Sequence, residues 1–144
     1  MEREIMGSVP RGNGLEIFIS DGKGLGVRAT RFFRTGELIE IAPVIVLDWP
    51  YSRCEQLPEP LGRYVYQWHD LLACATGFAM LYNHSYSPNA VYDTTESLGR
   101  PALVVNAWLD INPGDEITVN YNGEPGDATA IVFTECDKLL KLTR

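Results

Sequence analysis

Residues 83–90, Asn-His-Ser-Tyr-Ser-Pro-Asn-Ala, bring amide, imidazole and hydroxyl groups together within one short segment. The mostly apolar stretch at 71–81 comes directly before them and ties them to the protein core. Because buried polar groups need hydrogen-bond partners, these side chains are expected to meet others from elsewhere in the chain. Taken alone, a histidine in such a place is more often a satisfied structural residue than a functional one, so His84 needs support from other segments.

A glycine-rich segment, Asp-Gly-Lys-Gly-Leu-Gly-Val at 21–27, precedes this motif. Closely spaced glycines allow positive φ and let a ligand approach the backbone without obstruction from Cβ. A dinucleotide-binding fingerprint would continue into a helix, and a phosphate-binding loop would end in Gly-Lys-Ser/Thr, but the strand-like sequence 27–31 follows instead. Both nucleotide-binding motifs are therefore excluded, and a hairpin turn is the simplest interpretation of the segment on its own.

A third segment, Gly-Asp-Glu-Ile-Thr-Val-Asn-Tyr at 114–121, predicts a turn that feeds a strand and ends at Tyr121. An ordinary surface hairpin that carries an amphipathic tyrosine would show the same pattern. The meaning of this segment therefore depends on which other segments lie beside it.

The remaining sequence predicts short strands joined by turns. The strand at 15–19 should pair with 27–31 as a hairpin across the glycine-rich turn. Pro43 lies within the Ile- and Val-rich stretch 37–47, which indicates two short strands that meet there and not one long strand. The period of 71–81 settles neither helix nor strand. Also expected are strands at 64–68, 90–94, 102–109 and 116–121, a proline-rich surface loop at 48–62 with a helical turn near 52–56, and a short helix at 133–142.

Length and composition are typical of one globular domain. A chain of 144 residues with 45% hydrophobic and 22% charged residues can bury one core without a second domain. Its apolar runs fall short of the roughly 20 residues of a membrane helix, and the charged residues 1–4 lack the pattern of a secretory signal. We therefore expect a cytoplasmic protein outside any membrane, and association with a nucleoid or chromatin stays open.

The net charge indicates the class of partner, and the cysteine spacing bears on disulfides and metal binding. The formal net charge of −7 argues against direct binding of a nucleic-acid backbone and favours a basic partner. Cys54, Cys74 and Cys136 are widely spaced, without a Cys-x-x-Cys pair. This spacing suggests neither a disulfide framework nor a zinc site, so three buried thiols and no bound metal are expected.

Together, the three segments resemble the signature of the SET-domain protein lysine methyltransferases. Gly24–Val27 is similar to that family's Gly-x-Gly cofactor motif, and residues 83–89 are similar to its Asn-His-Ser-x-x-Pro-Asn motif. Residues 114–121 resemble its Gly-Glu-Glu-Leu motif, which closes on the catalytic tyrosine, and the turn at 34–39 resembles the connection after its second strand. The likeness is greatest for the minimal SET proteins of microbes and large viruses.

This resemblance implies a mostly β SET fold, with several small sheets around a pseudoknot and few short helices. It implies a single domain over residues 1–144, with its core at about 14–124. It also implies methyl transfer from S-adenosylmethionine (AdoMet) to the side-chain amine of a lysine in a protein substrate, such as a histone or another basic protein. The pseudoknot departs from the usual rule against threaded chains and would bring Asn83, His84 and Tyr121 together.

By resemblance, Tyr121 is the catalytic residue and Tyr64 lines the channel for the target lysine. Tyr66 and Trp68 would share the face of Tyr64 on a strand, where core packing is an equally good interpretation. Val119 stands where many family members carry an aromatic residue that limits the number of methyl groups added, so di- or trimethylation is expected. The residues implied in AdoMet binding are Lys23, Gly24, Leu25, Gly26, Asn83 and His84.

The sequence departs from the family pattern after the catalytic tyrosine, where many members carry a cysteine-rich zinc segment. Either residues 125–144 cover the site here, or a second protomer of a homodimer does so. Two other functions stay open. A non-catalytic SET-like module that binds AdoMet or a basic peptide is disfavoured by the intact Tyr121, and a Cys/His hydrolase using His84 lacks a nucleophile motif.

Overall fold

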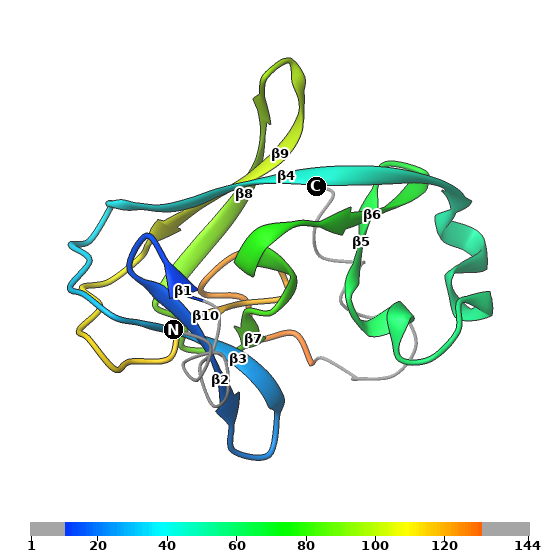
Figure 1. The fold of residues 1–144 in the computed structure, drawn as a ribbon. Coiled ribbons are helices and arrows are strands. Elements are labelled where there is room, and N and C mark those ends of the chain that lie inside the picture. The colour runs from blue at the N-terminus through cyan, green and yellow to red at the C-terminus, as the bar shows by residue number, and fades with distance from the viewer. Residues whose placement is uncertain (1–10, 131–144) are drawn as a thin grey trace, which may run out of the picture.

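The fold consists mainly of strands in three small sheets, as predicted (Figure 1). A computed structural model describes residues 11–130. Short 3-10 helices complete the described part: η2 (Tyr51–Gln56), η3 (Leu61–Arg63) and η4 (Gly77–Met80). The predicted helical turn near 52–56 lies within η2, and the helix predicted at 133–142 lies outside the described residues.

The first sheet contains the predicted hairpin and has the order β1 (Arg11–Gly12), β2 (Leu15–Ser20) and β3 (Gly24–Ala29). Strands β2 and β3 pair without interruption from Leu15 opposite Ala29 to Ser20 opposite Gly24. Strand β3 begins three residues earlier than predicted, so Gly24 and Gly26 belong to a paired strand, and the turn is shorter than the glycine-rich segment suggested.

The largest sheet is antiparallel and has the strand order β5-β6-β4-β9-β8. Its strands are β4 (Leu38–Pro50), β5 (Val65–Trp68), β6 (Leu71–Ala75), β8 (Ala90–Ser97) and β9 (Arg100–Ala107). The stretch 71–81, which had no clear period, is divided between β6 and η4.

Strand β4 corrects one prediction, because residues 38–50 form one long strand and not two short ones (Figure 1). Its first part pairs with β9 as far as Pro43 opposite Ala102, and its second part pairs with β6 from Val44 opposite Ala75. Pro43 has no N–H to donate and lies where one partner strand replaces the other. Its carbonyl accepts hydrogen bonds from the Thr76 N–H at 3.0 Å and the Thr76 hydroxyl at 2.6 Å. The proline therefore marks a change of partner without breaking the strand.

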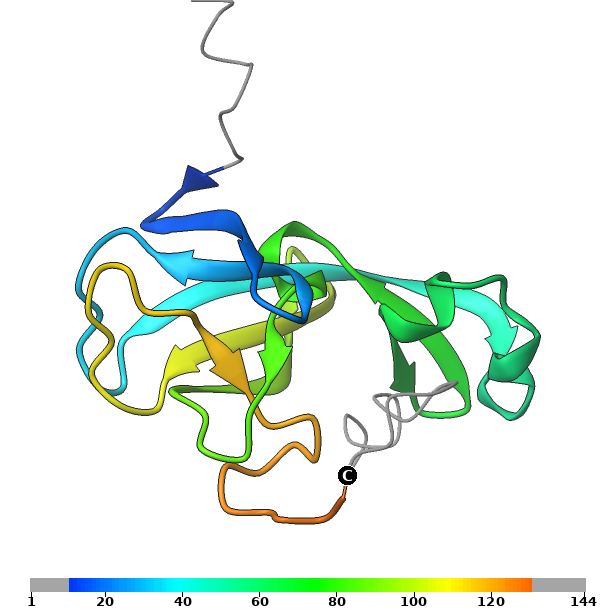
Figure 2. The ribbon, with the colours of Figure 1, turned by 90° about the horizontal axis from the view of Figure 1, so that it is seen from below.

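The third sheet is a two-stranded parallel pair, β7 (Asn83–His84) and β10 (Thr118–Val119), which lie side by side (Figure 2). The strand predicted at 116–121 is thus limited to two residues. This small sheet joins the polar motif at 83–90 to the segment that ends at Tyr121, although more than 30 residues separate them in the chain.

The buried core draws on the hairpin, the large sheet and the segments between them. Val27, Phe33, Leu72, Ile111 and Ile117 are fully buried and represent these regions. No helix in residues 11–130 is long and apolar enough to cross a membrane. 

The cysteines differ from their predicted state. Cys54 is disulfide-bonded, whereas Cys74 is a half-buried free thiol. The expectation of three buried thiols is therefore wrong. Cys136 lies outside the described residues.

Candidate active site

The parallel pairing of β7 with β10 places the end of the third motif against the polar motif. Thr118 lies opposite Asn83 and Val119 opposite His84, and the Ser85 N–H donates to the Val119 carbonyl at 2.9 Å. Asn89 extends this contact through its side chain, whose Nδ2 donates to the Glu116 carbonyl at 2.8 Å while its Oδ1 accepts from the Thr118 N–H at 2.9 Å. The Asn89 side chain therefore binds the backbone on either side of Ile117, next to the pairing of β7 with β10.

Tyr121 is held at both its backbone and its hydroxyl. Its N–H donates to His84 Nδ1 at 2.9 Å, and its hydroxyl donates to the Tyr82 carbonyl at 2.9 Å. The side chain is buried, and this burial raises the pKa of Tyr121 well above its ordinary value, with smaller contributions from Tyr64 and Glu116. The phenol therefore stays protonated and available as a hydrogen-bond donor throughout the neutral pH range.

His84 has a defined protonation state. Because Nδ1 accepts a hydrogen bond from the Tyr121 N–H, its ring proton must reside on Nε2. Burial lowers the pKa of His84, and the positive charge of Lys23 lowers it further. The ring meets the edge of Tyr86, with centroids 4.4 Å apart, and lies 5.2 Å from the Tyr121 ring centre. A neutral imidazole thus supports the backbone of Tyr121.

Asn83 belongs to a polar cluster that links all three predicted motifs. Its Nδ2 donates to Glu116 Oε2 at 2.7 Å and to the Leu25 carbonyl at 3.1 Å. The other carboxylate oxygen of Glu116 accepts from the Ser20 hydroxyl at 3.0 Å and lies 3.9 Å from Lys23 Nζ. The glycine-rich hairpin, the polar motif and the third motif therefore meet at one carboxylate.

The two glycines of the Gly-x-Gly sequence in the hairpin, Gly24 and Gly26, have different surroundings. Gly24 has a φ of +79°, and a Cβ built there meets nothing within 4 Å. A Cβ at Gly26 would lie 2.7 Å from Glu116 Oε2 and 2.8 Å from Asn83 Nδ2. Gly24 therefore supplies an open backbone surface, whereas Gly26 supplies the space for the Asn83 and Glu116 side chains.

The predicted channel residues lie near Tyr121. Tyr64 directly precedes β5 and is half-buried, and it lies near enough to Tyr121 to contribute, after burial, to the raised pKa of Tyr121. Tyr66 is buried, donates its hydroxyl to the Ala79 carbonyl at 2.7 Å and also interacts electrostatically with Tyr121. Its ring packs 6.3 Å from that of Tyr92. Tyr66 therefore contributes to the core, in agreement with the core-packing interpretation of this residue.

Glu40 and Tyr82 are two residues next to the site that the sequence did not single out. The Tyr82 hydroxyl donates to Glu40 Oε1 at 2.7 Å, and the Phe78 N–H donates to Glu40 Oε2 at 2.8 Å. Burial raises the pKa of Glu40, although both hydrogen bonds act in the opposite direction. Gly77 has a φ of +64°, and a Cβ there would overlap the carboxylate. Glu40 therefore fixes the segment whose Tyr82 carbonyl holds the Tyr121 hydroxyl.

A sequence signal for Glu40 did exist. It is the one charged residue in the apolar stretch 38–47, and a charge in such a place needs buried partners. The partners themselves could not be foreseen, because Phe78 and Tyr82 lie about 40 positions further along the chain.

The residues after Tyr121 fold into a loop that two buried asparagines organise. Asn120 Nδ2 donates to the Asp127 carbonyl at 2.7 Å, and Asn122 Nδ2 donates to the Thr129 carbonyl at 2.9 Å. Asn122 also donates its N–H to Asn120 Oδ1 at 2.9 Å. The loop at 123–129 is therefore attached on both sides of Tyr121, and it contains the first residues of the segment 125–144 that was expected to cover the site.

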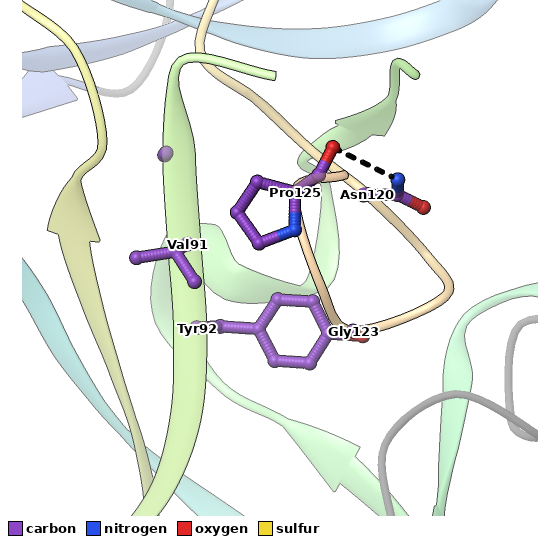
Figure 3. Close-up of a pocket in the computed structure, with 6 residues that line it drawn as sticks. Val91, Tyr92, Asn120, Gly123 and Pro125 are labelled. Carbon is purple, nitrogen blue, oxygen red and sulfur yellow. Dashed lines mark hydrogen bonds between the residues drawn. The ribbon is translucent and has the colours of Figure 1, made fainter. Parts of the chain in front are cut away.

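Two surface hollows near this loop do not contain the predicted site residues. A narrow crevice between β8 and the loop is lined by Val91, Tyr92, Asn120, Gly123 and Pro125 and has no room for a water molecule (Figure 3). A broader groove of about 360 Å³ lies beside it and includes Asp93 and Glu124. Neither hollow is lined by Asn83, His84 or Tyr121, so neither identifies the active site.

The site offers an open backbone and an amide oxygen to a ligand. Gly24 leaves the backbone open, and no hydrogen-bond donor of the described residues reaches Asn83 Oδ1, which is not buried. The structure brings His84 into contact with Tyr121, and it gathers Asn83, Gly26 and Lys23 around Glu116. Within residues 11–130 no three metal-ligating side chains cluster.

Known proteins share both this sequence pattern and this fold. The chain is 31% identical to the histone-lysine N-methyltransferase Set8 of Drosophila pseudoobscura pseudoobscura, over an alignment that covers 77% of this chain and 18% of that protein. It therefore spans less than a fifth of the length of this relative. A crystal structure of a Plasmodium falciparum protein, provisionally named a histone methyltransferase, matches with a TM-score of 0.63 and 28% identity, over 77% of this chain and 95% of that one.

The family comparison covers the residues that form the site. The SET-domain family matches residues 24–122, which include Gly24, Gly26, Asn83, His84 and Tyr121. The match extends over more than half of the chain, and the fold agrees with that of the solved structure. On both grounds, this chain belongs to the SET-domain family.

Proposed function

We propose that this chain is a protein-lysine N-methyltransferase that uses AdoMet. The observation that carries the proposal is the position of Tyr121, whose backbone is held by His84 and whose hydroxyl is held by the Tyr82 carbonyl. A buried, protonated phenol beside the Asn-His motif suits methyl transfer to an amine, because it offers fixed polar contacts away from bulk water.

The cofactor would lie against the open face of the glycine-rich hairpin. Backbone groups of residues 23–26 would hold its methionine part, and Asn83 and His84 would contact its amine and its adenine ring. When bound, AdoMet supplies an electrophilic methyl group on a positively charged sulfur. The exposed backbone at Gly24 supports this assignment, since a Cβ there would obstruct the approach of a ligand to the backbone.

The target lysine must lose a proton before it can attack the methyl group, because its amine has an ordinary pKa of about 10.4. Aromatic walls from Tyr64 and Tyr66 would desolvate the ammonium and lower its pKa, and they would still tolerate a methylated cation through cation–π attraction. The Tyr121 hydroxyl and the Tyr82 carbonyl would orient the amine at about 3 to 3.5 Å from the methyl group, in line with the bond that breaks. No dedicated general base is assigned.

The proposed substrate is a basic segment of a protein, with a histone as the first candidate. The formal net charge of −7 favours such a partner over a nucleic-acid backbone. The two relatives described above are named as histone methyltransferases, which makes histones the natural first substrates to test.

Substitution of Tyr121 by Phe tests the proposal. We expect methyl transfer to a histone mixture or a cell extract to fall roughly 100-fold or more, because the amine loses an orienting contact. AdoMet affinity, measured by calorimetry, should change little, because the substitution removes almost no cofactor-binding surface. Transfer is measured with labelled AdoMet, and mass spectrometry identifies the methylated residue.

Tyr51→Phe provides the matched control, because Tyr51 is half-buried on η2, outside the three motifs, and also loses only a hydroxyl. It should retain wild-type turnover. AdoMet binding without transfer to any protein would instead support a non-catalytic module. Full turnover by Tyr121→Phe on an identified substrate would remove Tyr121 from the mechanism.

A further inference from the structure

The side-chain amide of Asn83 can adopt only one of its two orientations. Its Nδ2 lies 2.7 Å from Glu116 Oε2 and 3.1 Å from the Leu25 carbonyl oxygen. Both partners are pure acceptors, a carboxylate and a backbone carbonyl. If the amide turned over, its oxygen would face two other oxygens without a hydrogen between them. The nitrogen must therefore point towards Glu116 and Leu25, and Oδ1 must point away from them.

Glu116 is itself held in place from several directions. Its Oε1 accepts a hydrogen bond from Ser20 and lies 3.9 Å from Lys23 Nζ, and its backbone forms an isolated bridge with Arg28 on β3. The side chain is only 20% exposed. The space for its contact with Asn83 exists because residue 26 has no Cβ. The carboxylate is therefore fixed before any ligand arrives.

The orientation of Asn83 has a chemical consequence for the proposed cofactor. The methionine part of AdoMet carries an ammonium group, which has only hydrogen-bond donors to offer. An amide oxygen would accept from this group, whereas an amide nitrogen would oppose it with its own hydrogens. A fixed Oδ1 should therefore give tighter binding than a freely turning amide, because no orientational freedom of the side chain is lost on binding.

We propose that Glu116 is a positioning residue, which orients the Asn83 amide so that Oδ1 faces the ammonium group of the bound cofactor. Ser20 supports Glu116 in this role, and Gly26 makes room for it. The inference rests on the proposed use of AdoMet. Glu116 acts through Asn83 and makes no contact of its own with the cofactor.

Calorimetric binding of two ligands tests this role without any catalytic turnover. One ligand is S-adenosylhomocysteine, and the other is its analogue in which hydrogen replaces the amino group. Glu116→Gln keeps the size of the side chain but can present an NH₂ group to Asn83, so that only the longer hydrogen bond to the Leu25 carbonyl still favours the original orientation of the amide. We expect about a ten-fold loss of affinity for S-adenosylhomocysteine, the size expected for one hydrogen bond to a charged group. The analogue should lose less than about two-fold, because it has no ammonium group for Oδ1 to hold.

Asn83→Ala and the double variant separate an action through Asn83 from a direct action of the Glu116 charge. If Glu116 acts through the amide, Glu116→Gln should cost no further affinity once residue 83 is Ala. Glu96→Gln is the matched control, because it removes one exposed carboxylate from the β8–β9 hairpin and should leave both affinities unchanged. Additive losses in the double variant, or equal losses for both ligands, would overturn the proposal.

Ser20→Ala keeps the test decisive if Glu116→Gln does not fold, as judged by circular dichroism and thermal unfolding. It removes the hydrogen bond to Glu116 Oε1 and leaves the charge and the Asn83 side chain intact. It should weaken binding of S-adenosylhomocysteine alone, and an unchanged affinity would contradict the proposal. Failure of the wild-type protein to bind S-adenosylhomocysteine at all would instead refute the cofactor assignment, and the role of Glu116 with it.

Discussion

His84 couples the position of Tyr121 to the pH of the solution. Its Nδ1 can accept the Tyr121 N–H only while the ring is neutral, since a protonated imidazole carries hydrogens on both nitrogens. Burial, and then the charge of Lys23, lower the pKa of His84 from its ordinary value of 6.5. The folded protein therefore binds the proton less readily than the unfolded chain does.

We predict that the contribution of His84 to stability is complete above pH 6.5 and is lost as the pH falls from 6.5 through the lower pKa of the folded protein. In this range the unfolded state binds more protons than the native state, so the free energy of unfolding must decrease as the pH falls. Urea unfolding at a series of pH values, together with an NMR titration of the ring, measures both quantities.

The titration is simplest in a His69→Asn variant, because His69 and His84 are the two histidines of the chain. Residue 69 has a φ of +55°, a conformation that asparagine tolerates. The remaining imidazole should titrate below 6.5. A pKa at or above that value would show that the ring does not accept the Tyr121 N–H in solution.

Val119 carries a second prediction at the level of single residues. Val119 is buried on β10, opposite His84 of β7 and two residues before Tyr121. A larger side chain at this position should crowd the space near Tyr121. The wild-type protein should therefore produce di- or trimethyllysine. Val119→Phe should shift the product towards monomethyllysine, at a stability cost of about 1–3 kcal/mol from overpacking.

Intact-mass analysis of a substrate peptide driven to completion distinguishes these products. Val119→Ala is the control, because it leaves at least as much space as the wild type and should preserve the higher methylation states. Exclusive monomethylation by the wild-type protein would contradict the prediction and leave the methyltransferase assignment unaffected.

Sequence patterns predicted the individual residues unevenly. Asn83, His84 and Tyr121 stood out because their motifs are short, polar and specific. Glu40 and Tyr82 did not, because their importance arises from one contact between distant segments that no local pattern encodes. The same holds for the pairing of Glu116 with Asn83, for which the motifs predicted nearness but not the hydrogen bond.

At the level of elements, strand β3 predicts different outcomes for its two glycines. Ala at Gly24 would adopt a φ near +79°, which should cost about 1–2 kcal/mol of the free energy of unfolding. Ala at Gly26 would instead displace the Glu116 and Asn83 side chains. Both changes should weaken cofactor binding, but for different reasons.

Double variants with Glu116→Gln reveal the difference. Gly26→Ala should add little to the loss of S-adenosylhomocysteine affinity caused by Glu116→Gln, since both disturb one contact. Gly24→Ala should add its loss in full. If Gly26→Ala instead added its full loss to that of Glu116→Gln, Gly26 would contact the ligand directly, as the Gly-x-Gly sequence alone suggests.

The elements themselves were predicted best where the pattern was local. The β2–β3 hairpin followed from alternating residues on either side of a glycine-rich turn. Strand β4 was mispredicted because a proline usually interrupts a strand. Pro43 is tolerated because it lies where β9 gives way to β6 as the partner, and this depends on where those two strands lie. The length of a strand is thus set partly by its neighbours, which the sequence of the strand does not contain.

At the level of the whole molecule, the mostly β architecture was predictable from composition, from turn residues and above all from the three motifs. The order of strands in the large sheet was not. Its central strand pairs with β9 on one side and β6 on the other, although both partners follow it by 20 residues or more in the chain. Such pairings depend on tertiary packing and leave no periodic signal in the sequence.

The parallel contact between β7 and β10 also has a consequence for the folding of the chain. Parallel strands cannot form by local hairpin closure, and here the contacts that complete the site join residues 33 to 39 positions apart. Since distant contacts form slowly, we expect the β2–β3 hairpin and the β8–β9 hairpin to form early and residues 114–122 to dock late. A nascent or partly folded chain would then carry every residue of the site and still lack the site, so cofactor binding would begin only when folding is complete.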